Sequence, residues 1–105
     1  MNQATTFRNL VNQEGIIVLP GVYDCLSSIL AEKAKHDGVL VTGAGVAASL
    51  LGLPDVGLIT MTEVLTQTKN IVNSVSIPVI ADCDTGYGNA INVYRTVKEF
   101  EQVGV

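Results

Sequence analysis

Residues 78–89 read Pro78-Val79-Ile80-Ala81-Asp82-Cys83-Asp84-Thr85-Gly86-Tyr87-Gly88-Asn89, and this stretch is the strongest indication of the fold. It begins with a short, continuous apolar run, which is typical of a strand covered on both faces in a parallel sheet. The run ends at Asp82 and passes through a glycine-rich turn to Asn89, a residue suited to cap a helix. The stretch therefore predicts a strand, a turn and a helix in succession.

Two upstream runs have the same apolar character, Ile16-Ile17-Val18-Leu19 and Val39-Leu40-Val41-Thr42. Helical patterns separate the three runs, and a polar helix over residues 5–13 precedes them. Strands that alternate with helices predict an α/β fold with a parallel sheet. At 105 residues the chain is far shorter than the about 250 residues of a complete β/α barrel. We therefore interpret residues 1–105 as a single partial domain.

Local signals mark where the helices begin and which side faces inward. Asp24 is a candidate N-cap, and Thr60 with Glu63 three positions later forms a capping box. Asn89 is the third candidate cap, and Gly104 is a suitable C-terminal stop. We expect these inward-facing positions: Leu26, Ile29 and Leu30 in the first of these helices; Val64, Leu65, Thr68, Ile71, Val72 and Val75 in the second; Val93, Val97 and Phe100 in the third.

Composition excludes several classes of protein. Hydrophobic residues make up 48% of the chain and charged residues 15%, which indicates a packed core and not a disordered chain. The net charge is −4 without a basic cluster, so we do not expect nucleic-acid binding. No run approaches the about 18–20 apolar residues of a membrane span, and the N-terminus lacks a signal-peptide layout. With only two cysteines, Cys25 and Cys83, we expect a reducing, cytoplasmic location.

The acidic pair after the third strand is the sharpest candidate site. Residues two apart in a strand point to the same side, so Asp82 and Asp84 are expected to direct two carboxylates into one pocket. Cys83 is expected to point the other way, towards the helices. Hard oxygen ligands suit Mg²⁺, and Gly86 and Gly88 allow a tight turn. The alternative is an acidic strand end that leads into a helix cap.

A second candidate follows the second strand, at Thr42-Gly43-Ala44-Gly45-Val46-Ala47-Ala48. Backbone N–H groups and a hydroxyl near a helix start can hold a carboxylate or phosphate. The string also matches a dinucleotide fingerprint with Glu63 as its acidic residue, but a helix there would break at Gly52-Leu53-Pro54. A purely structural turn is a third possibility. The connection from Gly43 to Ile59 is long, which favours a functional loop.

Four further residues have a structural and a functional interpretation. His36 near a helix end is interpreted as a dipole-compatible surface residue, and Asp24 as a cap. Tyr23 either lines the pocket or packs. Asp55 is a loop carboxylate whose simplest role is turn formation.

Three strings in order resemble the isocitrate lyase and phosphoenolpyruvate mutase superfamily: Pro20–Asp24, Thr42–Ser49 with Leu51–Asp55, and Asp82–Gly88. The resemblance implies the N-terminal part of a (β/α)8 barrel, about three β/α units plus a leading helix. It implies Mg²⁺ near Asp82 and Asp84. The site residues that it implies further are Thr42, Gly43 and Ala44 at the substrate carboxylate, Tyr23 and Asp55 at the border, and the supporting loop Gly86, Tyr87 and Gly88.

The same resemblance implies an activity. The family cleaves or forms a bond next to an α-keto acid through a metal-stabilised enolate, and the strings look closest to methylisocitrate, dimethylmalate and carboxyphosphonopyruvate enzymes. We therefore expect a Mg²⁺-dependent carbon–carbon lyase acting on a small hydroxy di- or tricarboxylate, 2-methylisocitrate lyase-like, in a homo-oligomer, tetrameric by resemblance. The alternatives are a carboxyvinyl-carboxyphosphonate phosphorylmutase, an oxaloacetate decarboxylase or hydrolase, and a non-catalytic truncated remnant.

The expected lyase is incomplete in this sequence. The family's lyases carry their catalytic cysteine in a Lys-Lys/Arg-Cys-Gly-His loop after the fourth strand, and that loop is absent from residues 1–105. Neither Cys25 nor Cys83 matches it. We therefore assign no catalytic residue within the chain.

Overall fold

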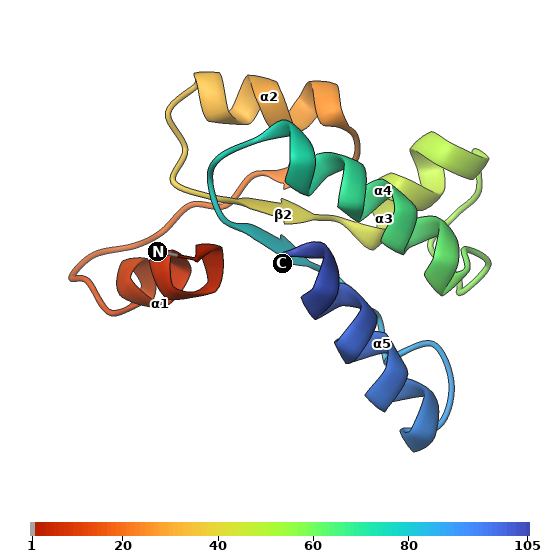
Figure 1. The fold of residues 1–105 in the computed structure, drawn as a ribbon. Helices are drawn as coiled ribbons and strands as arrows, with labels where there is room; N and C mark the ends of the chain where they lie inside the picture. The colour runs from red at the N-terminus through yellow and green to blue at the C-terminus, as the bar shows by residue number, and fades with distance from the viewer. Residues whose placement is uncertain (1) are drawn as a thin grey trace.

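The computed structural model describes residues 2–105 and contains the expected succession of helices and strands (Figure 1). The elements in chain order are α1 Gln3–Val11, β1 Gly21–Val22, α2 Cys25–Lys33, β2 Val39–Val41, α3 Gly43–Val46, the π-helix η1 Ala47–Leu51, α4 Met61–Ser74, β3 Val79–Ala81 and α5 Ala90–Val103.

The three strands form one parallel sheet in the order β1-β2-β3. Gly21 pairs with Leu40, and Leu40 pairs with Ile80. Figure 1 shows α2 and α4 side by side over one face of this sheet, α5 beyond α4, and α1 on the other side of the strands. The expected α/β fold with a parallel sheet is confirmed. Because all strands run the same way, their carboxyl ends, and the loops that follow them, meet at one edge.

The first strand lies later in the chain than the sequence pattern predicted. The expected strand 16–19 was wrong: these residues have no regular strand pairing, Ile16 is 92% exposed, and the observed strand is Gly21–Val22. The reason is register. The N–H of Leu40 donates to the carbonyl of Pro20, and β2 begins at Val39, so residues before Leu19 extend past the start of β2. An apolar run predicts burial, but it cannot specify which of its residues pair with a neighbouring strand.

The helix boundaries follow the predicted caps. The side chain of Asp24 accepts from the N–H of Ser27, and Thr60 and Asn89 each form a capping box with the residue three positions later. Gly104 ends α5 in the left-handed conformation, with φ 99°. These caps are local interactions between residues two or three apart, which explains why sequence alone predicted them.

Two expected inward faces need correction. Leu26 and Leu30 are 66% and 57% exposed, and α2 instead buries Ser28 and Ala31. Small side chains let the helix approach α4 and the sheet closely, and the Ser28 hydroxyl is satisfied by the carbonyl of Asp24 at 2.7 Å. In α5, Val97 is 59% exposed, while Thr96 and Phe100 are buried. The buried stripe of α5 is therefore centred on Thr96 and Phe100, four residues apart.

The core lies between the strands and helices α4 and α5. Its buried side chains include Val39 and Val41 of β2, Val64 and Ile71 of α4, and Phe100 of α5. The stripe predicted for α4 is confirmed at Val64, Thr68 and Ile71. The central strand β2 is the most deeply buried of the three, with Val39 and Val41 both 0% exposed.

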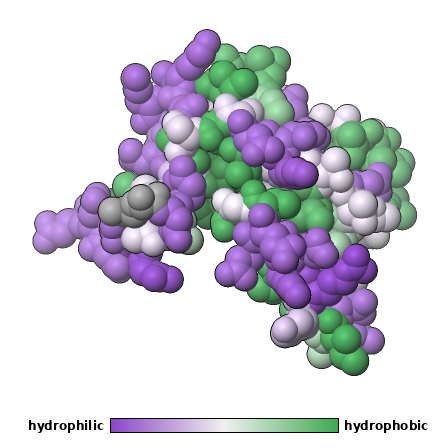
Figure 2. All heavy atoms as spheres, in the orientation of Figure 1, coloured by the Kyte–Doolittle hydropathy of each residue, from purple (hydrophilic) through white to green (hydrophobic). Residues whose placement is uncertain are grey.

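Apolar surface remains outside this core. Figure 2 shows it over α2 at the top and over η1 at the right. The exposed leucines include Leu26 and Leu30 of α2, Leu50 of η1, and Leu53, which follows η1. Within residues 2–105, no helix has the length and hydropathy needed to cross a membrane.

Candidate functional site

Asp82 and Asp84 follow β3 directly but lie in different backbone conformations. The N–H of Asp82 donates to the carbonyl of Val41 at 3.1 Å, so Asp82 still belongs to the parallel ladder. β3 ends at Ala81, and Asp84 has φ 49°, in the left-handed region. Strand alternation therefore does not extend to Asp84. A turn holds it instead: the N–H of Asp84 donates to Oδ1 of Asp82 at 2.9 Å, and the N–H of Gly86 to the carbonyl of Cys83 at 2.9 Å.

A contact between the ends of β2 and β3 joins the two strongest sequence motifs. The N–H of Gly43 donates to Oδ2 of Asp82 at 3.3 Å. A Cβ on residue 43 would lie 2.8 Å from the same oxygen, so only glycine admits the carboxylate at this distance. The backbone donor that the sequence assigned to a substrate carboxylate is thus directed to the protein's own carboxylate.

The other residues of the second motif are placed by the start of α3. Oγ1 of Thr42 accepts from the N–H of Gly45 at 3.2 Å and so caps α3. Gly45 lies against Tyr23, because a Cβ on residue 45 would be 3.2 Å from Cβ of Tyr23. Ala44 is exposed at the same edge. The loops after β1 and β2 are therefore adjacent, as expected for a site shared by neighbouring strands.

Tyr23 is partly exposed and is held through its backbone. Its carbonyl accepts from Nε2 of Gln67 at 3.0 Å, and its N–H donates to Oγ of Ser27 at 3.1 Å. The side chain is 42% exposed at the sheet edge. The sequence analysis did not single out Gln67. The only signal for it in the sequence is its position next to Thr68, which belongs to the buried stripe of α4.

The hydroxyl of Tyr87 lies within the electrostatic field of the loop carboxylates. Burial and, to a smaller extent, negative charge at Cys83, Asp82, Asp84 and Asp55 together raise the pKa of Tyr87 to about 12. Asp55, 27 or more residues upstream of the acidic pair, thus contributes to the same field. Tyr87 also lines a hollow of about 470 Å³ with Gly57, Thr60 and Arg95, among others.

The raised pKa of Tyr87 predicts that the fold loses stability at alkaline pH. The pKa of Tyr87 in the folded state lies above the ordinary 10.0. Its contribution to the free energy of unfolding is therefore fully present below pH 10 and is lost as the pH rises through about 12. We expect the unfolding free energy of the natural chain to fall more steeply between pH 10 and 12 than that of Tyr87→Phe. Denaturant titrations across this range measure the difference; parallel curves would contradict it.

Cys83 lies on the core side of the loop. It is half-buried and packs against the hydrophobic core, and burial, with a smaller effect of Asp82, raises the pKa of its thiol. A thiol with a raised pKa is a poor nucleophile at neutral pH. This placement fits the expectation that Cys83 faces inward while the acidic residues on either side are exposed.

Asp82 and Asp84 are the residues that could hold a hydrated magnesium ion. No three acidic, histidine or cysteine side chains within residues 2–105 converge as a complete metal site. Mg²⁺, however, typically takes one or two carboxylates and completes its shell with water or substrate. Asp82 and Asp84 are exposed carboxylates of that kind. Their oxygens are hard ligands, and the Gly43 cradle holds Asp82 in place.

The arrangement defines a class of protein: a parallel α/β unit with acidic residues and glycine-rich loops at the carboxyl ends of its strands, where β/α barrels place their sites. A family model described as phosphoenolpyruvate phosphomutase matches residues 7–105. The chain belongs to this family, within the isocitrate lyase and phosphoenolpyruvate mutase superfamily.

Similar proteins match all or nearly all of this chain. The 2,3-dimethylmalate lyase of Eubacterium barkeri is 47% identical over 105 residues, 100% of this chain and 36% of that protein. The 2-methylisocitrate lyase of Aeropyrum pernix is 44% identical, over 92% of this chain and 31% of that protein. The crystal structure of a phosphonopyruvate hydrolase complex with oxalate and Mg²⁺ matches with a TM-score of 0.94 and 32% identity, over 100% of this chain and 37% of that one.

The chain spans about a third of the length of the curated relatives that it matches. Its fold is that of the N-terminal part of the superfamily's (β/α)8 barrel, as the sequence resemblance implied. The local fold does not favour the dinucleotide alternative. The helix after Gly43 has only four residues before it passes into η1 and ends at Gly52.

Proposed function

We propose that this chain supplies the metal-binding half of a Mg²⁺-dependent lyase that releases an α-keto acid from a small hydroxy di- or tricarboxylate, such as 2-methylisocitrate. The observation that carries the proposal is the junction of Gly43 with Asp82, which unites the ends of β2 and β3 beside the exposed Asp84. The identities of 47% and 44% with a dimethylmalate lyase and a methylisocitrate lyase support the same reaction type.

Each group has a specific task in this proposal. Asp82 and Asp84 would hold the ion, which when bound stabilises negative charge on the enolate oxygen of the substrate. Gly43 would position Asp82, and the Thr42–Ala44 segment, in which Ala44 is exposed, would border the substrate carboxylate. Tyr23, beside Gly45, and Asp55 would border the site, and Gly86, Tyr87 and Gly88 would support the loop. Tyr87 stays protonated at neutral pH and can donate a hydrogen bond.

Assembly and location complete the proposal. Residues 1–105 would form one partial domain of a barrel enzyme. We expect that enzyme to be a homo-oligomer in the cytoplasm. Both cysteines are free thiols, which suits a reducing compartment.

Removal of the metal tests the function. We expect the full chain, expressed with any residues that its reading frame adds beyond Val105, to release an α-keto acid from 2-methylisocitrate or 2,3-dimethylmalate. Chelation by EDTA should lower turnover at least about 100-fold, since the charge stabilisation is lost, and excess Mg²⁺ should restore it. Keto-acid release is followed as a hydrazone.

The outcome separates the alternatives. Turnover that is unchanged by chelation would contradict the metal assignment. Turnover only with a carboxyphosphonate or with oxaloacetate would assign the chain to the mutase or hydrolase alternatives. Mg²⁺ binding without turnover of any of these substrates would favour the non-catalytic remnant.

A further inference from the structure

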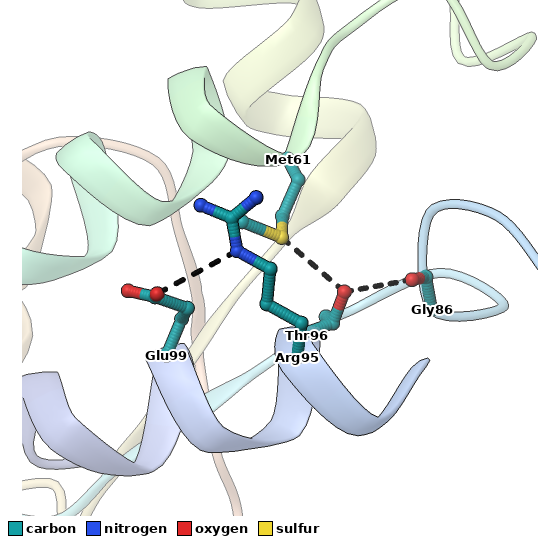
Figure 3. Close-up of polar contacts among 5 residues, drawn as sticks. All are labelled: Met61, Gly86, Arg95, Thr96 and Glu99. Atoms are coloured by element: carbon teal, nitrogen blue, oxygen red, sulfur yellow. Dashed lines mark hydrogen bonds and ion pairs between the residues drawn. The ribbon is translucent and has the colours of Figure 1, made fainter. Parts of the chain in front are cut away.

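Thr96 is a buried polar residue whose hydroxyl leaves its own helix. It lies in α5 and is 1% exposed. Oγ1 donates to the carbonyl of Gly86 at 2.7 Å and lies 3.2 Å from Sδ of Met61, the first residue of α4 (Figure 3). One side chain thus connects α5, the start of α4 and the loop after β3.

A second buried threonine shows that this connection is not the ordinary arrangement. Thr68 in α4 is 0% exposed, and its Oγ1 donates to the carbonyl of Val64 at 2.8 Å, within the same helix. A threonine inside a helix commonly bonds the carbonyl four residues back in this way. Thr96 instead bonds a loop carbonyl ten residues away.

The loop that Thr96 holds has a demanding backbone. Asp84, Gly86, Tyr87 and Gly88 have φ of 49°, 98°, 61° and 150°. Glycine adopts such φ values readily, but the left-handed conformation of Asp84 and Tyr87 costs free energy and persists only where surrounding contacts determine it. Gly86 also closes the turn around Asp84, because its N–H donates to the carbonyl of Cys83. The Gly86 peptide is therefore the point at which α5 can fix the direction of Asp84.

We propose that Thr96 is a positioning residue for the metal site: its hydroxyl fixes the Cys83–Gly86 turn and so presents Asp84 beside Asp82. This rests on the proposed function in that it takes the two aspartates as the ligands. Thr96 itself is buried behind the loop and contacts neither aspartate in the hydrogen bonds described for residues 2–105.

Metal affinity tests the proposal directly. Mn²⁺ binding to the full chain, measured from the free-ion electron paramagnetic resonance signal, is compared in Thr96→Val, Thr96→Ser and Thr68→Val. We expect Thr96→Val to weaken binding about 10-fold, at the lower end of the effect of removing an outer-shell partner, and Thr96→Ser to restore it. Thr68→Val is the matched control, since it removes an equally buried hydroxyl but should leave the affinity unchanged.

Hydrogen exchange provides a readout that needs no metal. The amides of residues 84–88 should exchange faster in Thr96→Val than in Thr68→Val, because only the former frees the loop. Equal exchange and equal Mn²⁺ affinity in the two variants would overturn the role of Thr96. A natural chain that binds no Mn²⁺, with loop exchange still faster in Thr96→Val, would overturn the metal role while showing that Thr96 holds the loop.

Discussion

Replacing Asp82 or Asp84 by Ala should lower the turnover of the complete enzyme about 10²- to 10³-fold, while folding is affected much less. Both side chains are exposed at the carboxyl edge of the sheet, where they contribute little to packing. Loss of a preorganised electrostatic contact to a developing negative charge typically costs about 3–4 kcal/mol of transition-state stabilisation. Steady-state kinetics, with unfolding curves for each variant, separate the two effects.

The neighbouring Cys83 supplies the control for this comparison. Cys83→Ala should act through packing, with about 1 kcal/mol lost in stability and little change in turnover, because the thiol contacts the core and not the site edge. Asp82→Ala has one further consequence. It also removes the acceptor for the N–H groups of Gly43 and Asp84. A folded Cys83→Ala without activity, beside fully active aspartate variants, would refute the metal assignment.

Replacing Gly86 by Ala should lower the free energy of unfolding by about 3 kcal/mol. Gly86 has φ 98°, a conformation that costs a residue with a side chain about 1–2 kcal/mol. A Cβ would also lie 2.3 Å from Cγ2 of Val93, and overpacking of this kind adds about 1–3 kcal/mol. Neither partner can move freely, since Val93 belongs to α5 and the Gly86 carbonyl is held by Thr96.

Gly52→Ala is the matched control. Gly52 also has a positive φ, 65°, but a Cβ there would meet no atom within 4 Å. Its substitution should therefore cost only the backbone contribution, about 1–2 kcal/mol. Chemical denaturation of both variants measures the difference. If Gly86→Ala proved no more destabilising than Gly52→Ala, the close contact between the loop and α5 would be wrong.

Local interactions account for what the sequence by itself determined. The caps at Asp24, Thr60 and Asn89 each join residues two or three apart, and the apolar runs of β2 and β3 can be recognised without knowledge of distant neighbours. These signals were sufficient for three strand–helix units, a parallel sheet and an acidic pair at the end of the third strand. They were insufficient for the first strand, whose position depends on where β2 begins.

Only the tertiary structure decided how the loops meet. The bond from Gly43 to Asp82 joins residues 39 apart, and that from Gln67 to Tyr23 joins residues 44 apart. The direction of the Asp84 turn, the inward position of Thr96 in place of Val97, and the field that raises the pKa of Tyr87 depend likewise on neighbouring elements. The physical reason is that a periodic pattern specifies which residues share a face. The register and rotation at which two faces pack determine which of those residues come into contact.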